Sequence, residues 1–348
     1  MNVRGRVLAA AIVSILMPAC AAHKQADIPA VAAFPGTLIL RWQDGVYGYR
    51  AGQTNPVKLA EMPSGSRVAG VSSDGVRLLT SDGQMVDLAA GTSTSLGVED
   101  ISEAAFSPDG RYVAALSGDP WQLVMADLRK DRMKPLGRGF CREYTELGTG
   151  KVEEVCSVAQ GVAWIDESTL VFSRQSSLPA SIIEQASGGP DTIAVMTPAG
   201  RTVREIESDA VVRELHGVTA LFTDGMWAPV SELLSGELRP RTLPVPTEEF
   251  GDPTAWLTPD GGELLVAGAP WRVLTLDSGG IRPLGSSHEM VLHQDTAWAP
   301  DGSMFACSDL DAAVVVGVPL SADQGGALLR WPMGTWGQGG AELLAWQG

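Results

Sequence analysis

One pattern of apolar and polar positions recurs along this chain. An apolar segment ends in Ser-Asp-Gly or Pro-Asp-Gly, and a second apolar segment follows at once. The copies are VSSDGVRLLT (71–80), FSPDGRYVAAL (106–116), WLTPDGGELLVA (256–267) and WAPDGSMFAC (298–307). In such a segment Asp caps a tight turn through its own backbone, and Gly supplies the positive φ that the turn needs. Each copy therefore predicts two strands joined by a tight turn.

A second repeated element extends the unit. GDPWQLVMADL (118–128) and GAPWRVLTLD (268–277) each follow one of these turns, and each predicts a third strand that ends near an Asp. A fourth strand completes the unit, which we write as strands a, b, c and d. Four-stranded units that recur about every 35–45 residues are typical of a β-propeller.

The ends of the chain predict how the ring closes. Six units are assigned to 67–98, 100–138, 157–206, 209–247, 252–285 and 290–334. LILRWQDGVYGYRAG (38–52) matches the b-to-c hairpin of the next unit, and AELLAWQG (341–348) resembles a strand a. The C-terminal strand then completes a seventh blade begun by the N-terminus, which hides sheet edges that would otherwise invite aggregation. We predict an all-β chain with one propeller domain over 36–348 and seven four-stranded blades; six remain the alternative if the irregular unit at 209–247 is misassigned.

The repeat resembles the PD40 repeat of TolB-type, WD-like propellers. The segments FSPDGRYVAAL, WLTPDGGELLVAG, WAPDGSMFACS and VSSDGVRLLTS carry this resemblance, which covers essentially all of 36–348. It implies the fold but little about function, because proteins with such repeats range from periplasmic scaffolds to the non-catalytic propellers of peptidases. The chain differs from the best-known periplasmic member because it has no room for a separate N-terminal α/β domain and has seven predicted blades.

The first 20 residues are predicted to be an export signal. Arg4 and Arg6 form a charged region, and residues 7–17 form an apolar region too short to span a bilayer. No later segment is long and apolar enough for a transmembrane helix. The sequence therefore predicts a protein exported to the cell envelope, on the periplasmic or cell-surface side of a membrane.

The end of this signal resembles the cleavage box of a bacterial lipoprotein. Small Ala19 precedes Cys20, which would become the lipidated N-terminus, and residues 21–35 would form a spacer. Met17 and Pro18 depart from the usual pattern of the box. Cleavage by the ordinary signal peptidase near Ala19 or Ala21 is the alternative.

The net charge of the chain limits the classes of binding partner that we expect. The chain has 25 Lys and Arg against 41 Asp and Glu, for a net charge of −16. A phosphate backbone needs a basic stripe, so nucleic acid is not an expected partner, and membrane contact is expected only through the lipid anchor. Neither a Cys-x-x-Cys pair nor an Asp-x-Asp-x-Asp run is present, and we predict no metal and no cofactor.

Two long insertions predict a binding face. They are 137–157, between strand d of one blade and strand a of the next, and 175–190, between strands b and c. Both connections belong to the same face of a propeller, and long excursions from a rigid scaffold often carry binding residues. Cys141 and Cys156 bracket one of them, and in an oxidising compartment we predict a disulfide worth about 3 kcal/mol. Candidate binding residues on these insertions are Arg142, Glu143, Tyr144, Glu146, Lys151, Glu153, Glu154, Glu184 and Gln185.

Candidates for catalysis are few. His288, Glu289 and His293 fall in the last d-to-a connection, on the same predicted face, and join the candidate binding residues. The spacing of these histidines suits neither one helix face nor alternate strand positions, and His216 stands by itself. Cys307, inside an apolar strand, is interpreted as a buried free thiol. The strand-end tryptophans are interpreted as packing between blades; they are Trp164, Trp256, Trp298 and Trp346.

The sequence favours a non-enzymatic, monomeric propeller that acts as a protein-binding scaffold in the bacterial envelope through its long-loop face. It contains no Gly-x-Ser-x-Gly elbow, no His-Glu-x-x-His motif and no phosphate loop. Two alternatives stay open. One is a propeller lyase or glycoside hydrolase that uses residues of the channel, and the other is a small-molecule or sugar-binding module.

Overall fold

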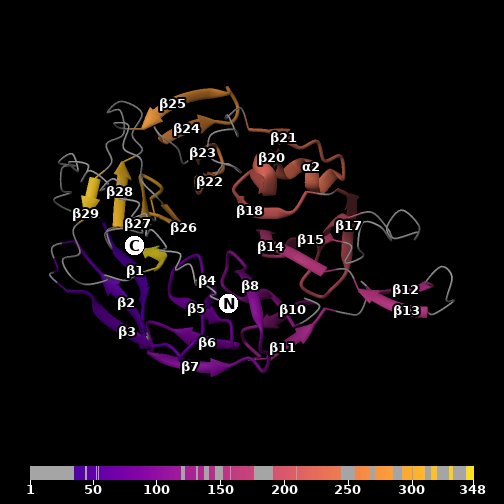
Figure 1. Ribbon diagram of the computed structural model, residues 1–348, viewed down its shortest axis with the longest axis horizontal. Helices are drawn as coiled ribbons and strands as arrows, with labels where there is room; N and C mark the ends of the chain where they lie inside the picture. Colours follow the sequence, from indigo (N-terminus) through magenta and orange to yellow (C-terminus); the bar gives the residue numbers. More distant parts are fainter. Residues whose placement is uncertain are drawn as a thin grey trace, which may run out of the picture.

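The computed structural model is a ring of antiparallel sheets (Figure 1). It describes residues 35–348 except 44, 52, 54, 119–121, 131, 137–140, 146–151, 157, 176–190, 209, 244–254, 267–270, 285–291, 300, 310–314, 320–328 and 332–341. The predicted export signal, Cys20 and the spacer lie outside these residues.

The first half of the chain contributes the following strands. They are β1 Thr37–Trp42, β2 Gly45–Tyr49, β3 Val57–Glu61, β4 Val68–Val71, β5 Arg77–Thr80, β6 Gln84–Asp87, β7 Thr92–Ser95, β8 Ile101–Phe106, β9 Tyr112–Ser117, β10 Gln122–Asp127, β11 Arg132–Pro135, β12 Cys141–Thr145, β13 Val152–Cys156, β14 Val158–Asp166 and β15 Thr169–Gln175.

The second half adds the remaining elements. They are β16 Thr192–Met196, β17 Thr202–Glu207, β18 Val212–His216, β19 Thr219–Phe222, the 3-10 helix η1 Thr223–Gly225, β20 Met226–Pro229, α2 Val230–Ser235, β21 Arg241–Thr242, β22 Ala255–Leu257, β23 Glu263–Val266, β24 Trp271–Thr275, β25 Gly280–Leu284, β26 Leu292–Trp298, β27 Met304–Asp309, β28 Val315–Pro319, β29 Leu329–Trp331 and β30 Glu342–Gln347.

Within the described residues these strands form seven four-stranded sheets and one two-stranded hairpin, β12–β13. Six sheets use consecutive strands: β4–β7, β8–β11, β14–β17, β18–β21, β22–β25 and β26–β29. The seventh has the order β3-β2-β1-β30, with Thr37 opposite Gln347 and Arg41 opposite Glu342. The predicted seven blades and their closure by the C-terminal strand are therefore confirmed.

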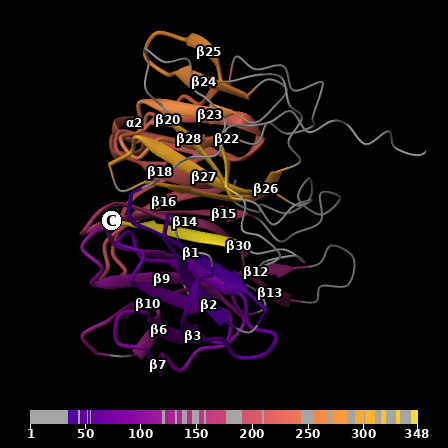
Figure 2. The same ribbon diagram turned by 90° about the vertical axis from the view of Figure 1, so that its left-hand side faces the viewer.

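The innermost strand of each blade is strand a, and neighbouring inner strands contact one another around the ring. Such contacts join β4 to β8, β8 to β14, β14 to β18 and β30 to β4. The a-to-b and c-to-d connections lie on one face, which we call the turn face; the b-to-c and d-to-a connections lie on the other, the loop face. Figure 2 shows α2, a c-to-d connection, and the hairpin β12–β13, a d-to-a connection, on opposite sides of the ring.

The hydrophobic core lies between blades. One cluster joins Leu116 and Met125 of one blade to Trp164 and Phe172 of the next. A second holds Leu38 and Trp346 of the closing blade against Ala297 and Ala306. Packing two sheets face to face removes apolar side chains from water, which is the main favourable term in folding. Trp164, Trp256 and Trp346 are buried and Trp298 is largely buried, which confirms the predicted packing role.

Candidate functional site

The Asp-Gly turns perform the structural task that the sequence predicted. In the turn before β5, the Ser72 hydroxyl donates to Asp74 Oδ1 at 2.5 Å and the Val76 N–H donates to the same oxygen at 3.0 Å. The same geometry holds for Ser107 and Asp109 at 2.6 Å, and for Thr258 and Asp260 at 2.7 Å. The carboxylate of each Asp thus accepts hydrogen bonds from its own turn.

These hydrogen bonds lower the pKa of each aspartate. Burial alone would raise the pKa of Asp74, but the hydrogen bonds from Ser72 and Val76 outweigh it and lower that pKa. The hydroxyl of Ser107 lowers the pKa of Asp109, and Thr258 does the same for Asp260. Ser303 lowers the pKa of Asp301 through its side chain and its N–H. Aspartates held ionised in this way are structural groups rather than proton donors or acceptors.

The predicted loop-face residues divide into two groups. Arg142, Glu143, Tyr144, Glu153 and Glu154 lie on the hairpin β12–β13, which Figure 1 shows at the rim of the ring, near the blade β14–β17. Only their backbone positions are described. His293 lies in β26, and its side chain is also outside the described set. The remaining candidates fall outside the described residues altogether: Glu146, Lys151, Glu184, Gln185, His288 and Glu289.

The hairpin places Cys141 directly opposite Cys156 in antiparallel register. Residues so paired have Cβ atoms about 4.5–5.5 Å apart, and a disulfide spans Cα atoms about 4.4–6.8 Å apart. The register is compatible with the predicted bond, which stays a prediction because the two side chains lie outside the described set. The interpretation of Cys307 as a buried thiol is confirmed, because it is buried in β27 and is not part of a disulfide.

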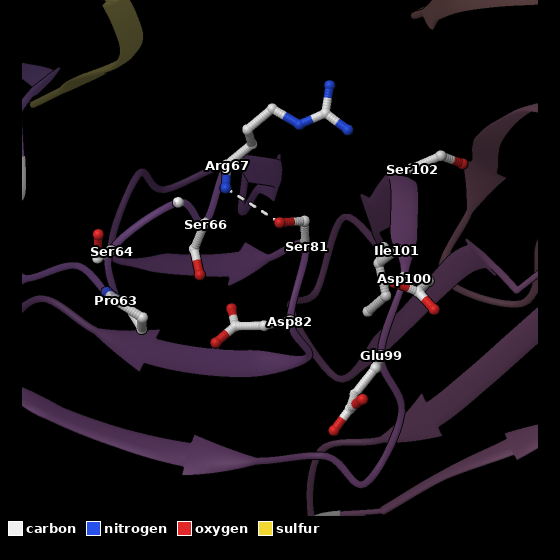
Figure 3. A pocket seen from close by; sticks show the side chains of 11 residues that line it. Pro63, Ser64, Ser66, Arg67, Ser81, Asp82, Glu99, Asp100, Ile101 and Ser102 are labelled. Carbon is white, nitrogen blue, oxygen red and sulfur yellow. Dashed lines mark hydrogen bonds between the residues drawn. The ribbon is translucent and has the colours of Figure 1, made fainter.

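A pocket of about 590 Å³ opens on the loop face (Figure 3). Three connections line it: residues 63–67 between β3 and β4, Ser81 and Asp82 between β5 and β6, and residues 99–102 at the entry to β8. All are b-to-c or d-to-a connections, so the pocket lies on the face that the sequence selected. The pocket itself was not predicted from the sequence, since its residues come from three connections of ordinary length.

Backbone hydrogen bonds hold these connections together at Ser81. Its N–H donates to Arg67 O at 2.8 Å, its hydroxyl accepts the Arg67 N–H at 3.0 Å, and its carbonyl accepts the Ile101 N–H at 2.9 Å. Arg41 of the closing blade also stabilises this region. It donates a hydrogen bond to Ser66 O and forms an ion pair with Glu342, both at 2.8 Å. The pocket is therefore preformed by the blade scaffold.

The pocket is acidic. Asp82, Glu99 and Asp100 line it, and Figure 3 shows that the Arg67 guanidinium points away from their carboxylates. No hydrogen bond or ion pair engages these three carboxylates within the described part of the chain. Asp82 Oδ1 is buried there without a donor. The Asp-Gly pair at 82–83 predicts a b-to-c hairpin, but its pattern alone does not reveal that the Asp82 carboxylate lacks a partner.

The central channel holds a second pocket, of about 860 Å³, lined by strands a of five blades. In it, His216 Nε2 lies 3.0 Å from Glu214 Oε1, and Glu214 Oε2 accepts the Leu257 N–H of the next blade at 3.2 Å. The sequence sets His216 apart as a single histidine, and the structure places the Glu214 carboxylate beside it. The signal was present in the sequence, because residues two apart on a strand share one face.

Another inner-strand carboxylate joins two blades. Glu103 of β8 accepts the Val162 N–H of β14 at 3.0 Å. Burial raises the pKa of Glu103, and the N–H groups of Val162 and Gly161 offset part of that effect. Glu103 and Glu214 thus act as interblade acceptors at two separate blade junctions.

Among the described residues, no group of three or more His, Cys, Asp or Glu side chains is arranged to hold a metal ion. Within the same set, every helix is too short or too polar to cross a membrane.

Taken together, the seven sheets, the closing strand and the central channel define a β-propeller. No protein-family model matches the chain, and no curated protein is similar to it in sequence. The solved C-terminal WD40 domain of Sif2 superposes with a TM-score of 0.51 at 12% identity, over 85% of this chain and 82% of that one. This likeness shows the fold alone.

Two other solved structures are similar at lower scores. TolB from Acinetobacter baumannii has a TM-score of 0.44 at 12% identity, over 90% of this chain and 67% of that chain. Hydrazine synthase from Kuenenia stuttgartiensis has a TM-score of 0.46 at 12% identity, over 76% and 87%.

Proposed function

We propose that the chain is a non-enzymatic, exported propeller that binds another envelope protein through its loop face. The preformed pocket of about 590 Å³ on that face is the observation that carries the proposal. It combines a rigid scaffold with carboxylates that no group in the described part of the chain engages, an arrangement suited to recognition rather than to packing. Lipid attachment at Cys20 and a monomeric ring belong to the same proposal.

Several features support a binding site on this face in particular. The aspartates of the turn-face Asp-Gly turns accept hydrogen bonds within their own turns, whereas the aspartates of the loop-face pocket do not. The hairpin β12–β13 extends the same face beyond the ring. Protein interfaces combine complementary shape with complementary charge, and the preformed acidic pocket supplies both on this face.

The test is a quantitative pull-down from envelope extracts with three proteins. One variant has residues 141–156 replaced by a short Gly-Ser linker, and another carries Ser64→Trp at the rim of the pocket. Glu167→Trp, at a site on the turn face that is also exposed, is the control. We expect partners that the control retains and that at least one loop-face variant loses. Identical partners for wild type and both loop-face variants would sink the proposal.

A second candidate function rests on the channel. The Glu214–His216 pair, with its carboxylate fixed by the Leu257 N–H, resembles a base and the group that orients it. A lyase or glycoside hydrolase would then use His216 as its proton acceptor. Activity on a panel of glycans and lactones that His216→Ala abolishes would support this candidate; no activity in the wild type would remove it.

A further inference from the structure

We propose that the loop-face pocket receives a cationic side chain, an Arg or Lys, presented by the partner protein. This inference rests on the proposed function and names the chemistry of its partner. The carrying observation is the state of Asp82, which differs from that of every other Asp-Gly turn described above.

The difference is visible within one sequence pattern. Ser72-Ser73-Asp74-Gly75 and Thr80-Ser81-Asp82-Gly83 match in type, yet only the first satisfies its Asp. In the second, the Thr80 hydroxyl donates to Gln84 O at 3.0 Å and accepts the Gln84 N–H at 3.0 Å. The Ser72 hydroxyl makes similar bonds to Arg77 and still donates to Asp74. In the second turn, the Gln84 N–H, which corresponds to the capping Val76 N–H, goes to Thr80 instead, and Asp82 Oδ1 is buried without a donor.

A buried carboxylate oxygen without a donor is costly, because it has lost water and gained nothing in return. Figure 3 shows the Asp82 carboxylate among Pro63, Ser66 and Ser81, on the pocket side of the turn. Such an oxygen can accept a hydrogen bond from a donor outside the chain. Charge-assisted hydrogen bonds from a guanidinium or ammonium are the strongest that it can accept.

The surroundings select a cation rather than a neutral donor. Glu99 and Asp100 line the same pocket, are exposed and have no ion-pair partner in the described part of the chain. Arg67 is the one basic lining residue, and it points away from them. The chain as a whole carries a net charge of −16, so long-range attraction also favours a basic partner.

The size of the site favours a side chain over a bare ion. A volume of about 590 Å³ exceeds what one ion needs, and the described residues contain no group arranged to hold a metal. A long flexible cation entering from the loop face can bring its charge to Asp82 while its backbone stays at the rim.

The test uses the full chain and a defined probe. The pentapeptide acetyl-Gly-Gly-Arg-Gly-Gly-amide is titrated and followed by amide NMR shifts at Gly83 and Ile101, with the citrulline peptide as its uncharged match. We expect shifts with the Arg peptide, and binding weaker by about tenfold or more in Asp82→Asn. Glu167→Gln changes an exposed carboxylate of the turn face that has no hydrogen bond or ion pair within the described residues, and it is expected to bind as the wild type does.

Thermal unfolding separates recognition from a structural role. Because Asp82→Asn removes an uncompensated charge, we expect a melting temperature equal to or above that of the wild type. Equal binding of the Arg and citrulline peptides, no binding by the wild type, or binding that Asp82→Asn leaves unchanged would overturn the inference. Partners that depend on the loop face but not on Asp82 would overturn it as well, while leaving the scaffold function standing.

Discussion

At the scale of single residues, carboxylates in this ring serve two different purposes. The aspartates of the turn-face Asp-Gly turns are hydrogen-bonded within their own turns, and Glu103 and Glu214 accept N–H groups of the next blade. Asp82 belongs to neither group. Residue type and the Asp-Gly pattern are shared, so the hydrogen-bond partners decide which carboxylates hold the fold and which are free to bind.

Glu103→Gln tests the interblade role. Burial raises the folded-state pKa of Glu103, so the folded protein binds more protons than the unfolded chain between the ordinary glutamate pKa of about 4.3 and the raised value. Stability from this group is therefore present at low pH and is lost as pH rises through that window. The amide keeps an acceptor for the Val162 N–H without a charge, so Glu103→Gln should be more stable than wild type at neutral pH.

Urea unfolding at pH 7 and near pH 4 measures this difference. The advantage of the variant should shrink toward the acid end, where a growing fraction of Glu103 is protonated in both states. An equal loss of stability at both pH values would mean that the amide cannot replace the carboxylate, and the burial argument would fail.

At the scale of elements, the Asp-Gly turns also link the blades. Gln347 donates to Gly75 O at 2.7 Å, Arg77 to Gly110 O at 2.8 Å, and Thr219 to Gly261 O at 2.7 Å. Each donor belongs to the blade that precedes the accepting turn. The same turn thus caps one hairpin and receives the neighbouring blade, which explains why the pattern recurs.

The bulge of β14 gives a sharper test of blade packing. Gly161 has φ +55°, and a Cβ there would lie 1.8 Å from Val212 O of the next blade. Gly91 has φ +64° and open space around it. Ala at either site pays a backbone cost of about 1–3 kcal/mol for positive φ, but only Gly161→Ala also forces the blades apart.

We therefore expect Gly161→Ala to lower the free energy of unfolding well beyond Gly91→Ala, measured by urea unfolding of both. Similar losses for the two variants would show that the approach of β18 to β14 is looser than described.

Many of the strands and turns could be predicted from the sequence. An Asp-Gly turn between apolar segments is a local signal, and local turn chemistry at 106–116 or 298–307 gives strands a and b directly. The closure by β30 followed from the likeness of 341–348 to another strand a. The loop-face pocket could not be predicted in this way, because Asp82, Glu99 and Arg67 meet only once two blades pack. The unpaired state of Asp82 depends on where the Thr80 hydroxyl points, which sequence does not specify.

At the scale of the whole molecule, the two faces of the ring have different roles in this account. On the turn face, the Asp-Gly turns are hydrogen-bonded within themselves, whereas the loop face carries the hairpin and the acidic pocket. A ring tethered through its N-terminus would be held near a membrane while one face stays available to a partner.

The tether is tested at Cys20. Cys20→Ser removes the thiol that lipid attachment requires, so the variant should move from the membrane fraction to the soluble fraction after cell fractionation. Wild-type protein with detergent is the positive control for release. A variant that stays with the membrane would contradict lipid attachment at this residue.

The most direct measurement of the central claim is site-specific photo-crosslinking in cells. A photoreactive amino acid is placed at Ser64, exposed at the rim of the loop-face pocket, and separately at Glu167, exposed on the turn face. We expect a discrete adduct with another protein from position 64 and none from position 167. An adduct from position 167 alone, or none from either position, would contradict it.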